Sequence, residues 1–244
     1  MSEPASNAAL TRIAHEIAAC RACPRLREHC ESVAQVKRRA YRDWTYWGLP
    51  VPGFGDARAR LYILGLAPGA HGANRTGRMF TGDDSGDWLY AALHANGFAN
   101  QPTAEHRDDG LELKDAFIGA VGRCAPPQNK LVAAEIAACR SFWRRELATF
   151  SGVRVIVPLG GVAFGELARW FAELQLMPRA QSKGAFTHGA ELVLDPIPTG
   201  PPCFTTRTHV VCSYHPSRQN TQTGRLTRSM LNDVFVRARA LVDA

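Results

Sequence analysis

The sequence predicts an α/β fold of three layers (α/β/α), in which helices cover both faces of a central, mostly parallel four-stranded sheet. Four short apolar runs, each of a length typical of a buried strand, support this: residues 60–66, 116–121, 153–159 and 208–213. Helical patterns separate the runs, as crossovers between parallel strands require. A turn rich in glycine and proline follows the first run, where α/β proteins bind their ligands.

The helices are predicted from apolar spacing and from the residues that end them. Residues 86–97, for example, stop at Gly97, a usual helix terminator. Residues 44–55 are read as an ordered surface segment, and residues 177–207, rich in Gly, Pro and Thr, as a long loop with room for a hairpin near 191–194. The predicted helices are residues 8–19, 86–97, 131–149, 161–174 and 226–242.

The composition predicts one domain over residues 1–244, with about the first ten residues disordered or loosely attached. A chain of 244 residues, 45% of them hydrophobic, is large enough for one sizeable core. No segment reaches the roughly 18 consecutive apolar residues of a membrane span, and the start of the chain lacks the pattern of a signal peptide. We therefore expect a cytoplasmic monomer with no membrane association.

The positive charge of the chain favours a partner that carries phosphate. Lys and Arg number 29 against 22 Asp and Glu, giving a net charge of +7. Arginine supplies most of the positive charge, and its guanidinium binds oxyanions through two parallel hydrogen bonds. A solvated basic surface is the alternative. The run Lys37–Arg42 fits a solvated face or a minor phosphate contact.

Four of the seven cysteines have a spacing that suits a metal centre. Two residues separate Cys20 from Cys23, and fourteen separate Cys124 from Cys139. Four thiolates can hold a [4Fe–4S] cluster or a zinc ion, and the spacing leaves both open beside four ordinary buried thiols. An odd number of cysteines without an export signal argues against a disulfide framework. The other three, Cys30, Cys203 and Cys212, are read as structural.

Two segments far apart in the chain are expected to meet at one edge of the sheet. The first, Gly65–Gly72, follows the first predicted strand, and the second, Ser213–Ser217, follows the last. Loops at the carboxyl ends of parallel strands face a common crevice. There the first segment offers backbone N–H groups to a ligand, and His215 in the second can donate a proton.

These segments and the cysteines resemble the uracil-DNA glycosylase superfamily, and most of all its iron–sulfur-containing family 5. The resemblance implies a monofunctional DNA glycosylase of base excision repair, which hydrolyses the N-glycosidic bond of uracil and other deaminated bases and leaves an abasic site. It also implies a [4Fe–4S] cluster on Cys20, Cys23, Cys124 and Cys139. The matching segments are residues 65–72, 77–83, 123–130, 215–221 and 224–227.

The resemblance implies that residues of these segments bind a base that has been extruded from DNA. His215 is expected to hydrogen-bond the departing base, Phe80 to stack on it and Asn129 to read its edge. Each residue also has a purely structural alternative: His215 as a hydrogen-bonded structural residue, Phe80 as a core residue, and Asn129 as a helix cap before Leu131. The backbone N–H groups of Ala67, Gly69 and Ala70 are expected to bind the base or a phosphate. The expected DNA contacts are Ser217, Arg218, Gln219 and Asn220.

One position departs from several relatives, which carry an acidic or amide side chain there to orient the attacking water. Leu66 and Ala67 are both apolar. Asn74, Asp83 or backbone carbonyls are the candidates to hold the water instead. The missing group leaves a second hypothesis open, a catalytically weak Fe–S protein that only recognises damage. A nucleotide-binding module is disfavoured because the first turn lacks a Gly-x-Gly-x-x-Gly pattern or a phosphate-loop lysine.

Overall fold

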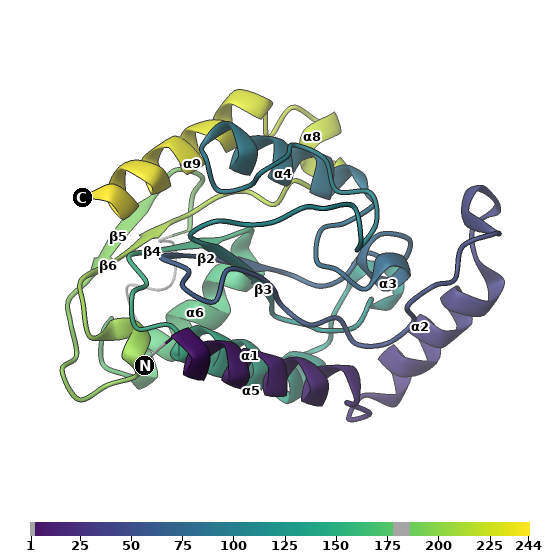
Figure 1. Cartoon of the computed structure of the whole chain (residues 1–244), viewed down its shortest axis with the longest axis horizontal. Helices are drawn as coiled ribbons and strands as arrows, with labels where there is room; N and C mark the ends of the chain where they lie inside the picture. Colours follow the sequence, from purple (N-terminus) through teal and green to yellow (C-terminus); the bar gives the residue numbers. More distant parts are fainter. Residues whose placement is uncertain (1–2, 178–185) are drawn as a thin grey trace.

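In the computed structural model, which describes residues 3–177 and 186–244, four parallel strands form the centre of one sheet (Figure 1). They are β2 (Leu61–Gly65), β3 (Ala116–Ala120), β4 (Val155–Pro158) and β6 (Thr208–Val211). Their order across the sheet is β3-β2-β4-β6, and all neighbours run parallel. This confirms the four predicted strands.

Two antiparallel strands extend the sheet to six, two more than the sequence predicted. β1 (Phe54–Gly55) pairs with β3, and β5 (Glu191–Leu194) pairs with β6. The prediction that residues 44–55 contain no strand is wrong at its last two residues, because a two-residue strand leaves no periodic pattern to detect. β5 forms the outer strand of the hairpin expected near 191–194, while residues 178–185 of the predicted loop lie outside the described part.

Helices cover both faces of the sheet, which confirms the three layers (Figure 1). Alternate residues of β2 point to opposite faces. Ile63 packs in the core beneath α4 (Asp84–Ala95) and α9 (Arg228–Asp243), whereas Tyr62 packs beneath α5 (Ala133–Thr149) and α6 (Gly161–Glu173). These four helices match predicted ones, with ends that differ by up to two residues.

The amino-terminal helices lie outside this central arrangement. α1 (Glu3–Ala18) begins earlier than predicted and is joined to α5 by the ion pair between Glu16 and Arg145. α2 (Pro24–Val36), which we did not predict, follows the first two cysteines and projects at the right of Figure 1. Among the described residues no helix is both long and apolar enough to cross a membrane. The short helices are α3 (Ala73–Thr76) and α8 (Arg218–Gln222), and the 3-10 turns are Arg39–Tyr41, Pro127–Asn129 and Pro202–Phe204.

Candidate functional site

The loops that follow β2 and β6 meet at the carboxyl edge of the sheet through Phe80 and His215. The two rings stack with centroids 5.7 Å apart and planes inclined by 30°. Segments far apart in the sequence are therefore brought together, as expected from parallel strands. Gly160, which follows β4, lies beneath the histidine, because a Cβ there would be 3.4 Å from the Cβ of His215.

Phe80 adopts a backbone conformation that L-residues seldom adopt. Its φ is 52°, in the left-handed region, and such strain is found mostly at functional sites. The ring lies directly on the end of β2, since a Cβ at Gly65 would come within 2.8 Å of it. Tyr90 on α4 donates a hydrogen bond of 2.7 Å to the preceding carbonyl, that of Met79. Phe80 is thus fixed as a flat apolar surface beside His215.

The environment of His215 keeps its imidazole neutral. Part of the residue remains accessible, but burial lowers the pKa of His215 to about 4. Its Nδ1 atom is buried and has no hydrogen-bond partner among residues 3–177 and 186–244. Asn220 positions the residue by donating a hydrogen bond of 2.8 Å from its side-chain amide to the carbonyl of His215. A neutral imidazole can donate one N–H without carrying charge into the site.

Backbone amides of the loop after β2 are available to a ligand. Among the hydrogen bonds of the described chain, the N–H groups of Ala67, Gly69 and Ala70 have no acceptor. The carbonyl groups of the same loop are used, however. Gly69 accepts from the backbone N–H of Asn74 at 3.0 Å, and Ala70 accepts from its side chain at 3.4 Å. The loop is therefore held by its oxygens while three N–H groups stay free.

Asn74 lies beneath this loop and is completely buried. Its side-chain nitrogen donates to the carbonyls of Ala70 and Cys30, each at 3.4 Å. Its Oδ1 atom accepts no hydrogen bond from any residue that the structure describes. An unpartnered buried amide oxygen is costly, so a polar ligand at this position would be stabilising.

Asp83 lies on the other flank of the loop and caps α4. Its Oδ1 accepts the backbone N–H of Gly86 at 3.1 Å. The other oxygen packs against the loop so closely that a Cβ on Gly69 would come within 2.7 Å of it. Burial, partly offset by hydrogen bonds from Gly86 and Ser85, raises the pKa of Asp83. The carboxylate has a structural role as a cap and a raised proton affinity.

Asn129 belongs to an exposed turn that follows β3. It and Gln128 both have positive φ, 57° and 54°, a conformation that asparagine tolerates well. The helix-cap alternative is wrong, because α5 begins at Ala133 and its N-cap is Val132. The Asn129 side chain is exposed and has no hydrogen bond within the described chain.

The four residues after Pro216 begin a short helix at the rim of the site. Arg218 makes an ion pair with Asp84, the first residue of α4, at 2.5 Å. Asn220 turns inward to the carbonyl of His215, so its side chain braces the loop. The carbonyl of Ser217 accepts the backbone N–H of Asn220 at 2.9 Å, and Gln219 is exposed. In the part of the chain that the structure covers, the side chains of Ser217 and Gln219 make no hydrogen bond.

The four cysteines lie near one another beside α2, where Cys23 is the N-cap. Burial, followed by the nearby thiols of Cys139, Cys124 and Cys20, raises the pKa of Cys23 to about 11. Cys30, read from the sequence as structural, packs in one cluster with Cys124, and its thiol donates to the carbonyl of Ala125 at 3.6 Å. The spacing of the cysteines in the sequence did not indicate that Cys30 lies beside the other thiols. Over residues 3–177 and 186–244, no group of three or more His, Cys, Asp or Glu side chains is arranged to hold a metal ion.

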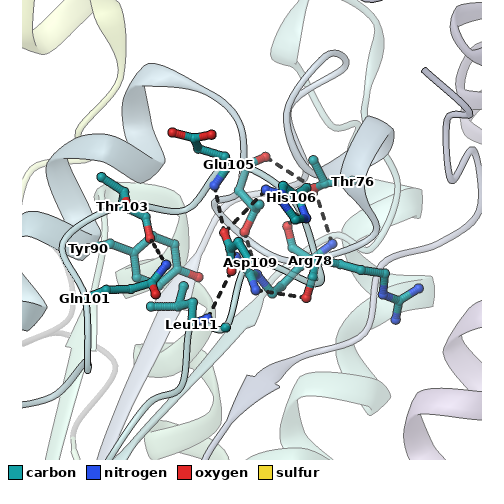
Figure 2. Close-up of polar contacts among 12 residues, drawn as sticks. Thr76, Arg78, Tyr90, Gln101, Thr103, Glu105, His106, Asp109 and Leu111 are labelled. Atoms are coloured by element: carbon teal, nitrogen blue, oxygen red, sulfur yellow. Dashed lines mark hydrogen bonds and ion pairs between the residues drawn. The ribbon is translucent and has the colours of Figure 1, made fainter. Parts of the chain in front are cut away.

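A buried network fixes the second half of the loop after β2 (Figure 2). Arg78 donates to Asp109 at 2.7 Å, to Thr81 at 2.9 Å and to the carbonyl of Arg107 at 3.1 Å. The carboxylate of Asp109 also accepts the backbone N–H groups of Glu105 and Leu111. With Arg78 and these amides as partners, the pKa of Asp109 is lowered to about 2 in spite of its burial. This network, which sequence reasoning missed, clamps the segment that carries Phe80.

Comparison with known proteins gives one consistent match. Residues 52–238 match the family model described as the uracil DNA glycosylase superfamily. The chain is 48% identical to a type-5 uracil-DNA glycosylase of Mycobacterium leprae, over 93% of both chains. It is 45% identical to one of Thermus thermophilus, over 92% of this chain and 94% of that protein, and 42% identical to one of Pyrobaculum aerophilum, over 91% and 88%.

Proposed function

Because the chain belongs to the uracil DNA glycosylase superfamily, we propose that it is a uracil-DNA glycosylase that acts in base excision repair. It hydrolyses the bond between uracil and deoxyribose in DNA. The observation that carries this function in the structure is the stack of Phe80 on a neutral His215 at the carboxyl edge of the sheet. A protein that only recognises damage would not require these groups, so this alternative is not favoured.

His215 is proposed to stabilise the leaving base. An extruded base enters the pocket and stacks on Phe80, since a base inside the duplex cannot be reached. When the glycosidic bond breaks, the base gains negative charge and the sugar gains positive charge. The imidazole donates an N–H to the base as that charge develops, a preorganised electrostatic effect. The free N–H groups of Ala67, Gly69 and Ala70 support hydrogen bonding to the same base.

We propose that Asn74, rather than Asp83, orients the attacking water. The Oδ1 atom of Asn74 is buried and unpartnered within the described chain, so it can accept a hydrogen bond from water. Asp83 is already committed to capping α4 through Gly86. An amide orients a water but does not remove its proton, so leaving-group stabilisation by His215 carries most of the catalysis. Such a site has few features specific to uracil, and we extend the proposal to other deaminated bases.

The [4Fe–4S] cluster is proposed to be held by Cys20, Cys23, Cys124 and Cys139. The other three thiols contribute, after burial, to raising the pKa of Cys23, and this shared neighbourhood supports the proposal. Four cysteines are the usual donor set of such a cluster, and a cluster spaces its ligands more widely than a single ion does. When bound, it would link the segment between α1 and α2 to the loop after β3 and to α5, as a structural element, because hydrolysis requires no electron.

The function is tested with a labelled duplex that contains one uracil. Incubation followed by alkali should cleave the strand at that position, because an abasic site is alkali-labile. Incubation without alkali should leave the strand intact, because neither segment around the site, residues 65–83 or 213–221, contains a lysine for a Schiff base. A duplex with thymine at the same position is the control. Intact DNA after both treatments contradicts the proposal. The enzyme is expected to act as a cytoplasmic monomer.

A further inference from the structure

The segment between α2 and β1 forms a projection that is fixed to the loop after β2. The chain leaves α2, makes the 3-10 turn Arg39–Tyr41 and returns, at the right of Figure 1. Two backbone bonds hold the returning segment: Trp47 donates to the carbonyl of Arg75 at 2.8 Å, and Gly48 donates to that of Asn74 at 3.0 Å. The projection is thereby joined to the residues proposed to bind base and water.

Stacked side chains make the projection rigid. The guanidinium of Arg75 lies 4.0 Å from the ring centroid of Tyr41 and 4.0 Å from that of Trp44. The hydroxyl of Tyr46 is hydrogen-bonded to Nδ1 of His71 at 3.0 Å. Arg75 and His71 belong to the loop after β2, so three separate side-chain interactions fix the position of the turn beside the site.

Three arginines of the turn carry positive charge that the fold does not use. Arg38, Arg39 and Arg42 are all exposed, and none takes part in an ion pair within residues 3–177 and 186–244. Most other arginines of the described residues are paired with a carboxylate or stacked on a ring, as Arg218 is with Asp84. Asp43 is the one acidic residue in the run from 37 to 44.

The turn lies close to the excision site as well as being fixed to it. The charge of Arg38 contributes to lowering the pKa of His71, for which burial is the largest cause. Arg38 also lies near Asp84 at the start of α4, the residue that pairs with Arg218. Arg38 of the turn and Arg218 of α8 therefore both lie near Asp84 at the rim of the site.

We propose that Arg38, Arg39 and Arg42 form a phosphate-binding ridge that grips the backbone of DNA beside the extruded nucleotide. Guanidinium groups on a rigid support lose little freedom when they bind, and they match the geometry of phosphate oxygens. Phosphate contacts fix the position of DNA without reading its sequence. The ridge explains how an enzyme that must search undamaged DNA can hold it in register with the pocket. This inference rests on the proposed function for its substrate.

The test measures binding of an undamaged labelled duplex as a function of salt, which does not depend on excision. The triple variant Arg38→Gln, Arg39→Gln, Arg42→Gln should lower the slope of log affinity against log salt by about 0.9 for each phosphate that is no longer neutralised, thus by about 2.7 in all. At 0.1 M salt, a slope that is lower by about 0.9 corresponds to an affinity that is roughly eightfold weaker for each lost phosphate contact. The triple lysine variant should keep the wild-type slope, because lysine neutralises phosphate equally well.

A control variant removes three positive charges from other parts of the surface, one of them, Arg207, paired with Asp195 at 3.6 Å. Arg154 and Arg207 immediately precede β4 and β6 at the amino ends of the strands, and Arg12 lies on α1; all three are exposed. The variant Arg12→Gln, Arg154→Gln, Arg207→Gln should bind nearly as the wild type does. Equal decreases of affinity in both triple variants, or no decrease in the ridge variant, overturn the proposal.

Excision at saturating enzyme separates this inference from the proposed function. The ridge variant should reach the wild-type single-turnover rate once it is saturated, and require more enzyme to do so. If the wild type itself excises no uracil, the proposed function fails, while the binding measurements still decide the ridge. A ridge variant that binds as tightly as the wild type overturns the ridge alone.

Discussion

The side chain of Asn74 donates a hydrogen bond to the main-chain oxygen of Cys30, at 3.4 Å. Cys30 lies on α2, the helix whose N-cap is Cys23, and Asn74 lies on α3, the short helix in the segment that follows β2. The carbonyl of Gly48, whose amide binds Asn74, accepts a hydrogen bond of 3.1 Å from Arg27 on the same helix. The cysteine region and the excision site are therefore one connected unit, and a change in the first is expected to reach the second.

Replacement of a proposed cluster ligand should remove iron from the protein. Purified wild-type protein should be brown and contain about four irons and four sulfides per chain. Cys139→Ser should reduce the iron content and the thermal stability, since α5 loses its link to α2. Iron analysis, sulfide analysis and the visible absorption spectrum measure this.

Two further variants identify the ligands. Cys30→Ala and Cys212→Ala should keep the iron, because these thiols are not proposed ligands. Loss of iron in Cys30→Ala would mean that Cys30, which contacts Cys124, is a ligand itself. Colourless wild-type protein with one zinc per chain would contradict the cluster.

Replacement of His215 by Ala should slow excision far more than it weakens binding of DNA. The hydrogen bond to the base strengthens only as charge develops, so it acts in the transition state. The expected loss of the single-turnover rate is on the order of 10²–10³, as for one oxyanion donor. Affinity for the undamaged duplex should change little. Full single-turnover activity of the variant would show that the leaving base is stabilised elsewhere.

The stability of the protein should depend on pH through His215. Its pKa is about 4 in the folded chain against the ordinary 6.5, so the unfolded chain binds the proton first as pH falls. The wild type should therefore lose stability relative to His215→Gln between pH 6.5 and 4, amounting to about 2 kcal/mol at pH 5. Denaturant unfolding at pH 7 and pH 5 measures the difference. A stability difference that is equal at both pH values contradicts the lowered pKa.

Asn74→Ala should slow excision more than Asp83→Asn does, on the order of 10² for the former. The alanine removes the buried amide oxygen that is proposed to hold water. Asparagine caps helices about as well as aspartate, so Asp83→Asn preserves α4 while removing the carboxylate. Single-turnover rates of the two variants give the comparison, and their unfolding curves report the structural effect. The reverse order would assign the water to Asp83, and two near-wild-type rates would assign it to backbone carbonyls.

The central strands and the meeting of Phe80 with His215 were predictable from the sequence. Buried parallel strands form continuous apolar runs, and their carboxyl ends share one edge, so the order of the motifs limits which loops can meet. β1 was not predictable, because a strand of two residues is too short to show the alternation of apolar and polar side chains. α2 was missed because its residues are mostly polar and only Leu26, Arg27 and Cys30 are buried.

The surroundings of the site were less predictable, because they depend on interactions between distant segments. Nothing in the spacing of the cysteines indicates that Cys30 packs with Cys124, and nothing in the run Lys37–Arg42 indicates that Tyr41 stacks on Arg75. The contact that Asn220 makes was also missed, because it joins two residues through the fold of the turn. Its side chain was expected on DNA, but the turn after Pro216 directs it to the carbonyl of His215.

The positions of the cysteines and of His215 also imply an order during synthesis. The four proposed ligands all occur before residue 140, whereas β6 and the histidine that follows it are made in the last part of the chain. Domains synthesised on the ribosome begin to organise from the amino terminus. A growing chain can thus carry a complete set of iron ligands while it still lacks β6 and one wall of the excision pocket. Assembly of the proposed cluster can precede any capacity to attack DNA.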